Sequence, residues 1–235
     1  MRLLILSDIH ANPWALQAIE QDAGPVDFIL CAGDVVNYGP DPHGAIAWLR
    51  EHNAISVRGN HDNAVGFNAH PRASPAKAHV ALALRDWTQS KLSDVDIRWL
   101  RRLPTRLTWE IQDRRFALVH ATPFDPLYDY RMTPKVSDSQ IEMMLSGIAA
   151  DVIIVGHTHL PFTRQHRQWL IINPGSSGQP LDGDPTAAYA LWTDGQVILR
   201  RVSYDQSALF EAIKTMAIPF AISSELTRML QTARP

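Results

Sequence analysis

The chain has 235 residues, of which 46% are hydrophobic and 20% are charged, and these values are ordinary for a globular protein. Its 22 Lys and Arg residues nearly balance its 24 Asp and Glu residues, so the formal net charge of −2 argues against a general nucleic-acid-binding surface. The one cysteine, Cys31, excludes an internal disulfide framework and predicts a reducing, cytoplasmic compartment.

The hydrophobic runs of the sequence are short. At the N-terminus the apolar run 3–6 is followed directly by Ser7 and Asp8, which makes it too short for a signal peptide. No apolar run approaches the ~18–20 residues that a membrane-spanning helix needs. We therefore expect no membrane partner.

Apolar runs recur along the chain, and runs that are apolar at consecutive positions are typical of strands buried on both faces in α/β proteins. Helix-like segments lie between these runs, so we expect an α/β fold. The predicted strands cover residues 3–6, 28–30, 55–57, 116–119, 152–155, 170–172, 187–192 and 197–199.

Helix signals separate the predicted strands. Asn12-Pro13 is a good N-cap and first-turn pair for the first helix. The other predicted helices cover 42–51, one or two stretches between 75 and 103 with a break near Ser93-Asp94, then 137–145, 203–216 and 223–232. We expect the segments 63–75 and 124–134 to be loops that select the substrate.

The organisation of the chain predicts a single domain over residues 1–235. The sequence has no internal repeat and no low-complexity linker that would mark a boundary. We expect a helical insertion near 66–103 and a helical C-terminal tail near 203–235.

Side chains that bind metals follow five of the predicted strands, at the point where each strand ends. Sites in α/β proteins form at the carboxyl ends of strands, so we expect these side chains to meet at one edge. Residues i and i+2 of an extended chain point to the same side, which directs two of the histidines to one place. The residues are Asp8 and His10, Asp34, Asn60 with His61 and Asp62, His120, and His157 with His159.

The residue types favour divalent metals. Carboxylate and amide oxygens and imidazole nitrogens bind manganese, iron, zinc and nickel. The number of candidate ligands exceeds one tetrahedral site and favours two metals, which sit ~3.5–4 Å apart in many phosphatases and nucleases. Asp34 is the natural bridging carboxylate. Two divalent ions outweigh the charges of Asp8, Asp34 and a bridging hydroxide, so the site should attract a phosphate anion.

The combined pattern resembles the calcineurin-like metallophosphoesterase family, with all five blocks in the family's order over residues 1–192. The resemblance implies a four-layer α/β/β/α sandwich of two mainly mixed β-sheets flanked by helices, with a dinuclear metal site at the carboxyl edge of the strands. The blocks are Asp8-x-His10, Gly33-Asp34, Gly59-Asn60-His61-Asp62, His120 and Gly156-His157-x-His159.

The resemblance also implies a role for each residue. One metal would be held by Asp8, His10, Asp34 and His159, and the other by Asp34, Asn60, His120 and His157. A metal-bridging hydroxide would attack the phosphorus in line, His61 would act as general acid on the leaving group, and Asp62 would orient His61. Manganese is the expected metal, with iron, zinc and nickel as alternatives.

One position departs from the protein phosphatases of this family. They carry Gly-Asp-x-Val-Asp-Arg-Gly after the second strand, and here the arginine is replaced by Tyr38. The stretches around Tyr38 and around the turn Asn173–Ser176 look more like the small bacterial phosphodiesterase-like members, in which that turn returns near the site. We name Tyr38, Arg58 and Arg131 as candidate substrate contacts.

The predicted function is hydrolysis of a small phosphomonoester or phosphodiester substrate. The alternative is a catalytically weak metal-binding scaffold for protein interaction on the same fold. A metal-dependent amidohydrolase is disfavoured, because that barrel normally needs eight strand–helix units and this chain is short for it. The physiological substrate and the oligomeric state, monomer or homo-oligomer, are left open.

Taken singly, each motif has a plain structural interpretation. Asp8 and Asp34 would serve as helix caps, and Asn60 and Asp62 as turn residues. Five such strand ends together favour a site. The remaining histidines are expected on the surface or on helices, although His79 in the helical insertion could face the site. Their positions are His43, His52, His70, His79 and His166.

Overall fold

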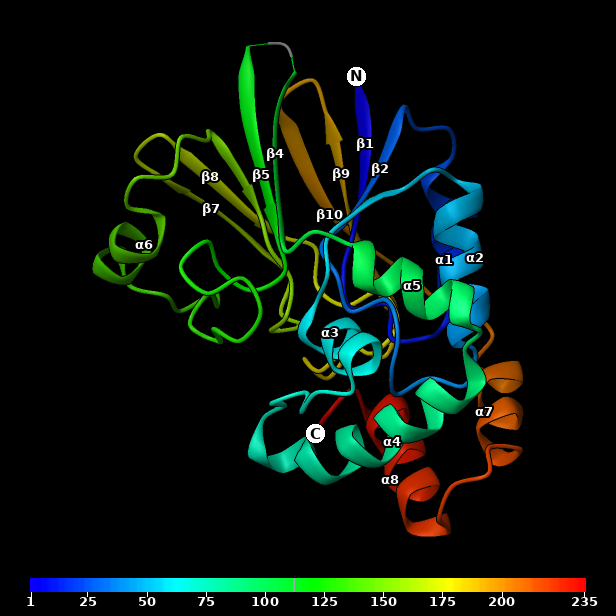
Figure 1. The fold of residues 1–235 in the computed structure, drawn as a ribbon. Coiled ribbons are helices and arrows are strands. Elements are labelled where there is room, and N and C mark those ends of the chain that lie inside the picture. The colour runs from blue at the N-terminus through cyan, green and yellow to red at the C-terminus, as the bar shows by residue number, and fades with distance from the viewer. Residues whose placement is uncertain (112) are drawn as a thin grey trace.

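The computed structural model describes residues 1–111 and 113–235, which form two five-stranded β-sheets flanked by helices (Figure 1). The first sheet has the order β10-β9-β1-β2-β3, with β1 (Arg2–Leu6), β2 (Phe28–Cys31), β3 (Ile55–Ser56), β9 (Ala187–Thr193) and β10 (Gln196–Val202). The second has the order β4-β5-β6-β8-β7, with β4 (Arg106–Ile111), β5 (Arg114–Val119), β6 (Val152–Ile154), β7 (Phe162–His166) and β8 (Trp169–Asn173).

Both sheets are mixed. Strands β1, β2 and β3 are parallel to one another, β9 pairs antiparallel with β1, and β10 pairs antiparallel with β9. Strands β5, β6 and β8 are parallel, and the edge strands β4 and β7 pair antiparallel to them. The carboxyl ends of β1 and β2 point toward the middle of the molecule in Figure 1.

The two sheets pack face to face because side chains alternate across each strand. Leu3 and Ile5 of β1 belong to a core between the sheets that also contains Phe116 and Ile154. Leu4, next to them on β1, faces the other way into a core with the helices of the first sheet. The layers are therefore helices, sheet, sheet and helix, which confirms the predicted fold class.

Helices cover both outer faces (Figure 1). α1 (Pro13–Ala23) and α2 (Pro42–Glu51) pack on the first sheet with α5 (Asp94–Arg102). α6 (Asp138–Leu145) packs on the second sheet. Asn12, Ser93 and Ser137 accept hydrogen bonds from the first turns of α1, α5 and α6, which confirms the predicted N-cap at Asn12 and adds two at Ser93 and Ser137.

A group of helices lies beyond the carboxyl ends of the strands, in the lower part of Figure 1. We call α4 (Ala78–Lys91), α7 (Ser207–Lys214) and α8 (Phe220–Thr232) the helical cap. The cap has its own core, in which Val80 and Leu84 of α4 pack with Leu226 of α8 and with Tyr38. α3 (Asn60–Phe67) and the short 3₁₀ helix η1 (Pro75–Lys77) connect the first sheet to α4.

Most predicted elements are present, with some differences. The strands β4 and β7 were not predicted, because both carry alternating exposed and partly buried residues in place of a continuous apolar run. The start of the predicted loop 63–75 is helical, since α3 extends to Phe67. α7 begins at Ser207, later than predicted, and α8 begins at Phe220, earlier than predicted. The single domain over residues 1–235 stays a prediction.

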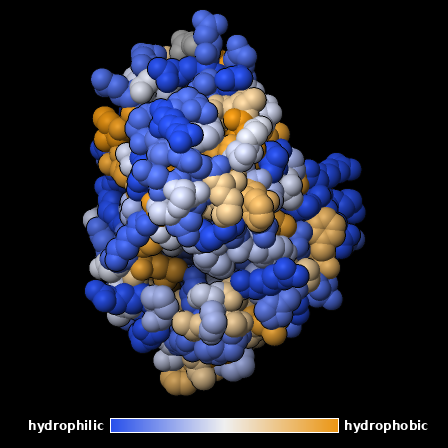
Figure 2. Space-filling view, turned by 90° about the vertical axis from the view of Figure 1, so that its left-hand side faces the viewer, coloured by the Kyte–Doolittle hydropathy of each residue, from blue (hydrophilic) through white to orange (hydrophobic). Residues whose placement is uncertain are grey.

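The surface that carries α6 is mostly polar, with apolar residues scattered over it (Figure 2). Phe124 and Met143 are the large apolar side chains exposed in the loop before α6 and on α6 itself. None of the described helices combines the length and the apolar character that crossing a membrane requires.

Gly33 illustrates how tightly the strand ends approach one another. Its φ is +92°, and a Cβ added there would lie 2.7 Å from the Gly59 backbone nitrogen. Gly147 also has a positive φ, +76°, but a Cβ there would meet nothing within 4 Å. A residue with a Cβ would have a strained backbone at both positions and would be crowded only at Gly33.

We expect Gly33→Ala to lower the free energy of unfolding by about 2–4 kcal/mol, from a strained φ plus overpacking. Gly147→Ala is the control and should cost about 1–2 kcal/mol from φ alone. Urea unfolding of both variants measures the difference. Equal destabilisation of the two would show that the contact between the strand ends is looser than described.

Candidate metal centre

The strand ends that carry the predicted ligands meet at one edge of the two sheets. Five of the predicted ligands have left-handed φ values between 48° and 67°, which non-glycine residues seldom adopt. Such backbone persists where the surroundings impose it and is concentrated at functional sites. The predicted ligands are all at most 3% exposed: Asp8, His10, Asp34, Asn60, His120, His157 and His159.

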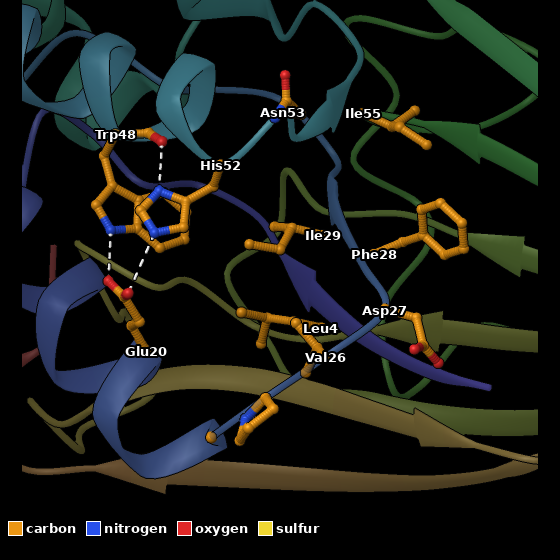
Figure 3. A pocket seen from close by; sticks show the side chains of 12 residues that line it. Leu4, Glu20, Val26, Asp27, Phe28, Ile29, Trp48, His52, Asn53 and Ile55 are labelled. Atoms are coloured by element: carbon orange, nitrogen blue, oxygen red, sulfur yellow. Dashed lines mark hydrogen bonds and ion pairs between the residues drawn. The ribbon is translucent and has the colours of Figure 1, made fainter.

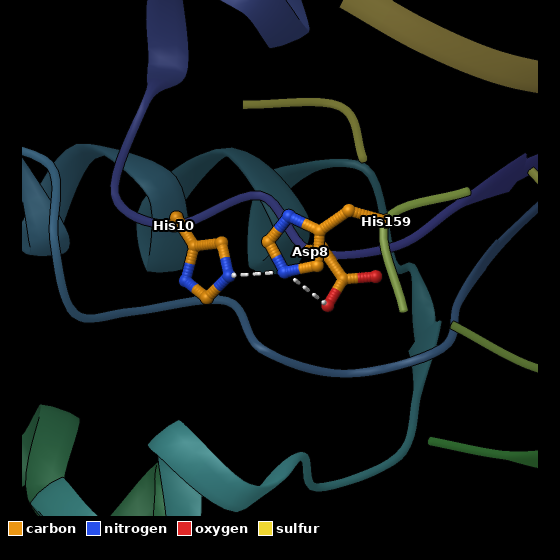
Figure 4. A group of neighbouring side chains, drawn as sticks. All are labelled: Asp8, His10 and His159. Carbon is orange, nitrogen blue, oxygen red and sulfur yellow. Dashed lines mark hydrogen bonds and ion pairs between the residues drawn. The ribbon is translucent and has the colours of Figure 1, made fainter. Parts of the chain in front are cut away.

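The first cluster joins Asp8, His10 and His159 (Figure 4). His159 Nε2 lies 3.3 Å from His10 Nε2 and 3.4 Å from Asp8 Oδ1. The Nδ1 atoms of His10 and His159 face the backbone carbonyls of Val36 and Gln179, so we assign the ring protons to Nδ1. Both Nε2 atoms then carry lone pairs that face each other, an arrangement that a cation stabilises.

The second cluster is built on His120. Its Nδ1 faces the Ala32 carbonyl at 2.8 Å and donates to it, so Nε2 carries the lone pair when the ring is neutral. This Nε2 lies 2.9 Å from Asn60 Oδ1, 3.0 Å from His157 Nδ1 and 3.2 Å from Asp34 Oδ2. The Asn60 amide nitrogen donates to the Pro71 carbonyl, so its oxygen is the atom turned toward His120.

Asp34 connects the two clusters. Its Oδ2 lies 3.2 Å from His120 Nε2 and 3.9 Å from His10 Nε2, while its Oδ1 accepts the His61 backbone N–H at 2.8 Å. Asp8 Oδ1 and His157 Nε2 are buried and receive no hydrogen bond. Acceptor atoms thus converge from five strand ends with too few donors, so the residues present fit divalent metal ions.

The pKa values follow from burial and mutual charge. Burial raises the pKa of Asp8 to about 7. Burial lowers the pKa of His120, but the Asp34 carboxylate more than compensates and raises it to about 9. When no metal is bound, a proton on His120 therefore offsets the negative charge of Asp34, and a metal must displace that proton.

His61 and Asp62 lie at the start of α3, and their contacts differ from the predicted pair. Asp62 accepts hydrogen bonds from the backbone nitrogens of Asp34 and Gly59, and of two further residues that follow Asp34. The His61 Nδ1 atom lies 2.7 Å from the side-chain nitrogen of Asn37. The prediction that Asp62 orients the His61 ring is therefore wrong: Asp62 holds the strand ends together, and Asn37 contacts the ring.

The orientation of Asn37 is fixed by its neighbours. Its oxygen accepts the Tyr38 N–H at 2.9 Å, and its nitrogen also donates to the Ala81 carbonyl in α4 at 3.1 Å. The nitrogen is thus the atom turned to His61, and it donates to Nδ1. A neutral His61 ring then carries its proton on Nε2. Burial lowers the pKa of His61 to about 4, in line with a neutral ring.

The candidate substrate contacts have other partners. Tyr38 is 1% exposed, and its ring lies 5.0 Å from those of both His10 and His61. Arg58 donates to the Arg101 carbonyl and lies over the Phe67 ring. The substrate roles of Tyr38 and Arg58 stay predictions.

Three other expectations concern residues around the site. Arg131 is ion-paired with Asp129, and its substrate role stays a prediction. His79 is exposed on α4 and pairs with Glu225, so the suggestion that it faces the site is wrong. The turn after β8 does return to the site, because Ser176 Oγ donates to the Asp8 carbonyl at 2.6 Å.

A cavity of about 510 Å³ lies at the opposite end of the first sheet, where β2 and β3 begin (Figure 3). Leu4, Ile29 and the stacked rings of Trp48 and His52 line it, and Glu20 accepts hydrogen bonds from both rings. Within the described residues, the groups arranged to hold a metal are the two clusters at the other edge. The chemistry is therefore assigned to that edge and not to this cavity.

Comparison with known proteins gives a consistent result. Residues 1–195 match the model of the calcineurin-like phosphoesterase superfamily domain. The chain is 30% identical to an uncharacterised protein of Methanocaldococcus jannaschii over 92% of this chain and 93% of that protein. It is 28% identical to phosphodiesterase YfcE of Escherichia coli over 89% of this chain and 96% of that protein. The chain superimposes on the crystal structure of a metallophosphoesterase from Sphaerobacter thermophilus with a TM-score of 0.80. The two sequences are 31% identical, and the match covers 97% of this chain and 99% of that chain.

Metal binding should release protons. With pKa values of about 9 for His120 and about 7 for Asp8, binding displaces one proton between those values and two below pH 7. For each proton displaced, the apparent affinity for the metal should fall about tenfold per unit decrease in pH. Calorimetric titration with Mn²⁺ in buffers of different ionisation enthalpy measures the release. His79→Ala is the control, and a release that does not change with pH would contradict the assignment.

Proposed function

The chain belongs to the calcineurin-like phosphoesterase superfamily, as its five sequence motifs predict, and on that premise we propose that it hydrolyses a small phosphate ester with two divalent metal ions. The observation that carries the proposal is the convergence of acceptor atoms into two clusters that share Asp34. The similarity to phosphodiesterase YfcE supports a phosphodiester or a phosphomonoester as the bond that is broken.

We assign the ligands by the two clusters. Asp8, His10 and His159 would hold one ion, and Asn60, His120 and His157 the other, with Asp34 bridging them. Two metal ions held in this way would supply an activated water for in-line attack and would neutralise charge on the phosphoryl oxygens. Manganese is our first choice among manganese, iron, zinc and nickel.

The protein side chains keep the centre electropositive. Four histidines and one asparagine contribute no negative charge, so Asp8 and Asp34 are the anions among the proposed ligands. Their burial shields them from water and strengthens their interaction with bound cations. An anionic phosphate is therefore favoured over a neutral substrate.

For His61 we propose hydrogen-bond donation from Nε2 to the leaving-group oxygen. Full proton transfer from an imidazolium would place an Nδ1–H against the Asn37 amide donor 2.7 Å away. A neutral ring avoids that clash and still stabilises negative charge as it develops on the leaving oxygen. Asn37 acts as the positioning residue for this ring.

The central test combines metal content with turnover. Elemental analysis should find about two metal equivalents per chain, and added Mn²⁺ should support hydrolysis of bis-p-nitrophenyl phosphate or p-nitrophenyl phosphate. Asp34→Asn should reduce kcat by at least about 100-fold and lower metal content, whereas Asp138→Asn on exposed α6 should change neither. Metal binding without turnover by any metal would favour the protein-interaction scaffold instead.

The pH profile tests the state of His61. Because burial lowers its pKa to about 4, the ring is already neutral at higher pH, and its titration should not change kcat between about pH 6 and 8. His61→Ala should still lower kcat about 100-fold for an alkyl ester, and less for a p-nitrophenyl ester whose leaving group needs little help. A loss of kcat above pH ~6.5 that disappears in His61→Ala would instead indicate an imidazolium acid.

A further inference from the structure

One lysine lies buried beside the metal centre without an obvious structural role. Lys77, the last residue of η1, is 5% exposed, and its ammonium lies 6.0 Å from the centre of the Tyr38 ring. That ring lies 5.0 Å from the rings of both His10 and His61. The connection η1 therefore places a positive charge on the side of the site where His61 lies.

The charge of Lys77 reaches both clusters. Burial lowers the pKa of His159 well below its usual value, and the Lys77 charge lowers it further. Burial likewise lowers the pKa of Lys77 itself to about 8, while the charges of Asp8 and Asp34 oppose that effect. The side chain is thus close enough to the proposed ligands to sense them electrostatically.

Lys77 has no ion-pair partner of its own. Across residues 1–111 and 113–235, no carboxylate oxygen lies within 4.0 Å of its ammonium, although other basic side chains of the chain have such partners. A buried cation is costly unless it is paired. The Tyr38 ring gives it a cation–π contact, which offsets only part of that cost.

Metal binding makes the missing partner more important. Asp8 and Asp34 are the charges that favour a protonated Lys77, and two divalent ions would more than neutralise them. The ammonium then lies in a site with an excess of positive charge. An anionic substrate would restore the charge balance of the site.

We propose that Lys77 is a substrate-binding residue whose ammonium binds an oxygen of the phosphate group, and that it favours phosphates with two negative charges over phosphodiesters with one. The inference rests on the proposed function of the same site. Two metals, two aspartates and Lys77 leave three positive charges. Hydroxide plus a phosphomonoester dianion balances these charges, and hydroxide plus a diester leaves one in excess.

The test uses the full-length, manganese-loaded protein and inorganic phosphate as the probe. Lys77→Met replaces the aliphatic part of the side chain with an unbranched apolar chain of about the same length and removes the ammonium. Lys91→Met is the matched control, because Lys91 also lies over an aromatic ring, that of Trp87, at the exposed end of α4. Calorimetry should show a 10- to 100-fold loss of phosphate affinity, by order of magnitude, in Lys77→Met and no change in Lys91→Met.

Stability and metal content separate this role from a structural one. Removing an unpaired buried charge should leave Tm unchanged or raise it, with full metal content. A fall in Tm together with loss of metal would identify Lys77 as structural and overturn the proposal. Lys77→Gln, which is also uncharged but polar, provides a second variant if Lys77→Met does not fold, and unchanged phosphate affinity in either folded variant also overturns it.

Kinetics test the charge preference. Lys77→Met should raise KM for p-nitrophenyl phosphate at least about tenfold more than for bis-p-nitrophenyl phosphate. Equal effects on the two esters would overturn the preference for dianions. Phosphate binding needs no turnover, so a wild-type protein that binds phosphate through Lys77 but hydrolyses neither ester would contradict the proposed function and leave this inference intact.

Discussion

The crowding of acceptor atoms at one sheet edge is the constraint on which the rest of the site depends. His10 Nε2 and His159 Nε2 lie 3.3 Å apart, each with its proton held on the far side of the ring by a backbone carbonyl. His120 faces three acceptors, and a proton on its own Nε2 offsets the charge of Asp34 until a metal displaces it. Such a concentration of acceptor atoms favours a bound cation, which gives the left-handed backbone at this edge a reason beyond folding.

A single carboxylate, that of Asp62, connects the loops at this edge of the sheets through hydrogen bonds. Asp62 accepts backbone hydrogen bonds from Gly59 and from Asp34 and its two successors, which ties the end of β2 to the start of α3. Burial raises its pKa to about 7, and these hydrogen bonds oppose that rise. The spacing of Gly59-Asn60-His61-Asp62 therefore combines three elements in one helical turn: a proposed ligand, the ring proposed to face the leaving group, and the carboxylate that ties the end of β2 to the start of α3.

The sequence predicts this edge well because the information is local. Each ligand follows an apolar run, and a run of Val, Ile and Leu that ends in Asp or His can be read without knowing its partners. β4 and β7 could not be predicted in this way, since edge strands alternate polar and apolar residues and depend on pairing. Asn37 and Lys77 were missed for a different reason. Their proposed roles depend on contacts with His61 and Tyr38, and no sequence pattern around Asn37 or Lys77 predicts those contacts.

Asn37 and Lys77 show how the helical cap contributes to the candidate site. The sheets position the proposed metal ligands, whereas α4 contacts Asn37, the proposed positioning residue for His61, and follows Lys77, a proposed substrate contact. Asn37 donates to the Ala81 carbonyl in α4, and Lys77 immediately precedes that helix. Tyr38 lies between them, with its ring in the cap's own core alongside α8. Because α8 packs against α4, the C-terminal part of the chain supports the helix that Asn37 contacts and that Lys77 precedes. The proposed substrate contacts therefore lie beside the helical cap, whereas the proposed metal ligands lie at the sheet edge.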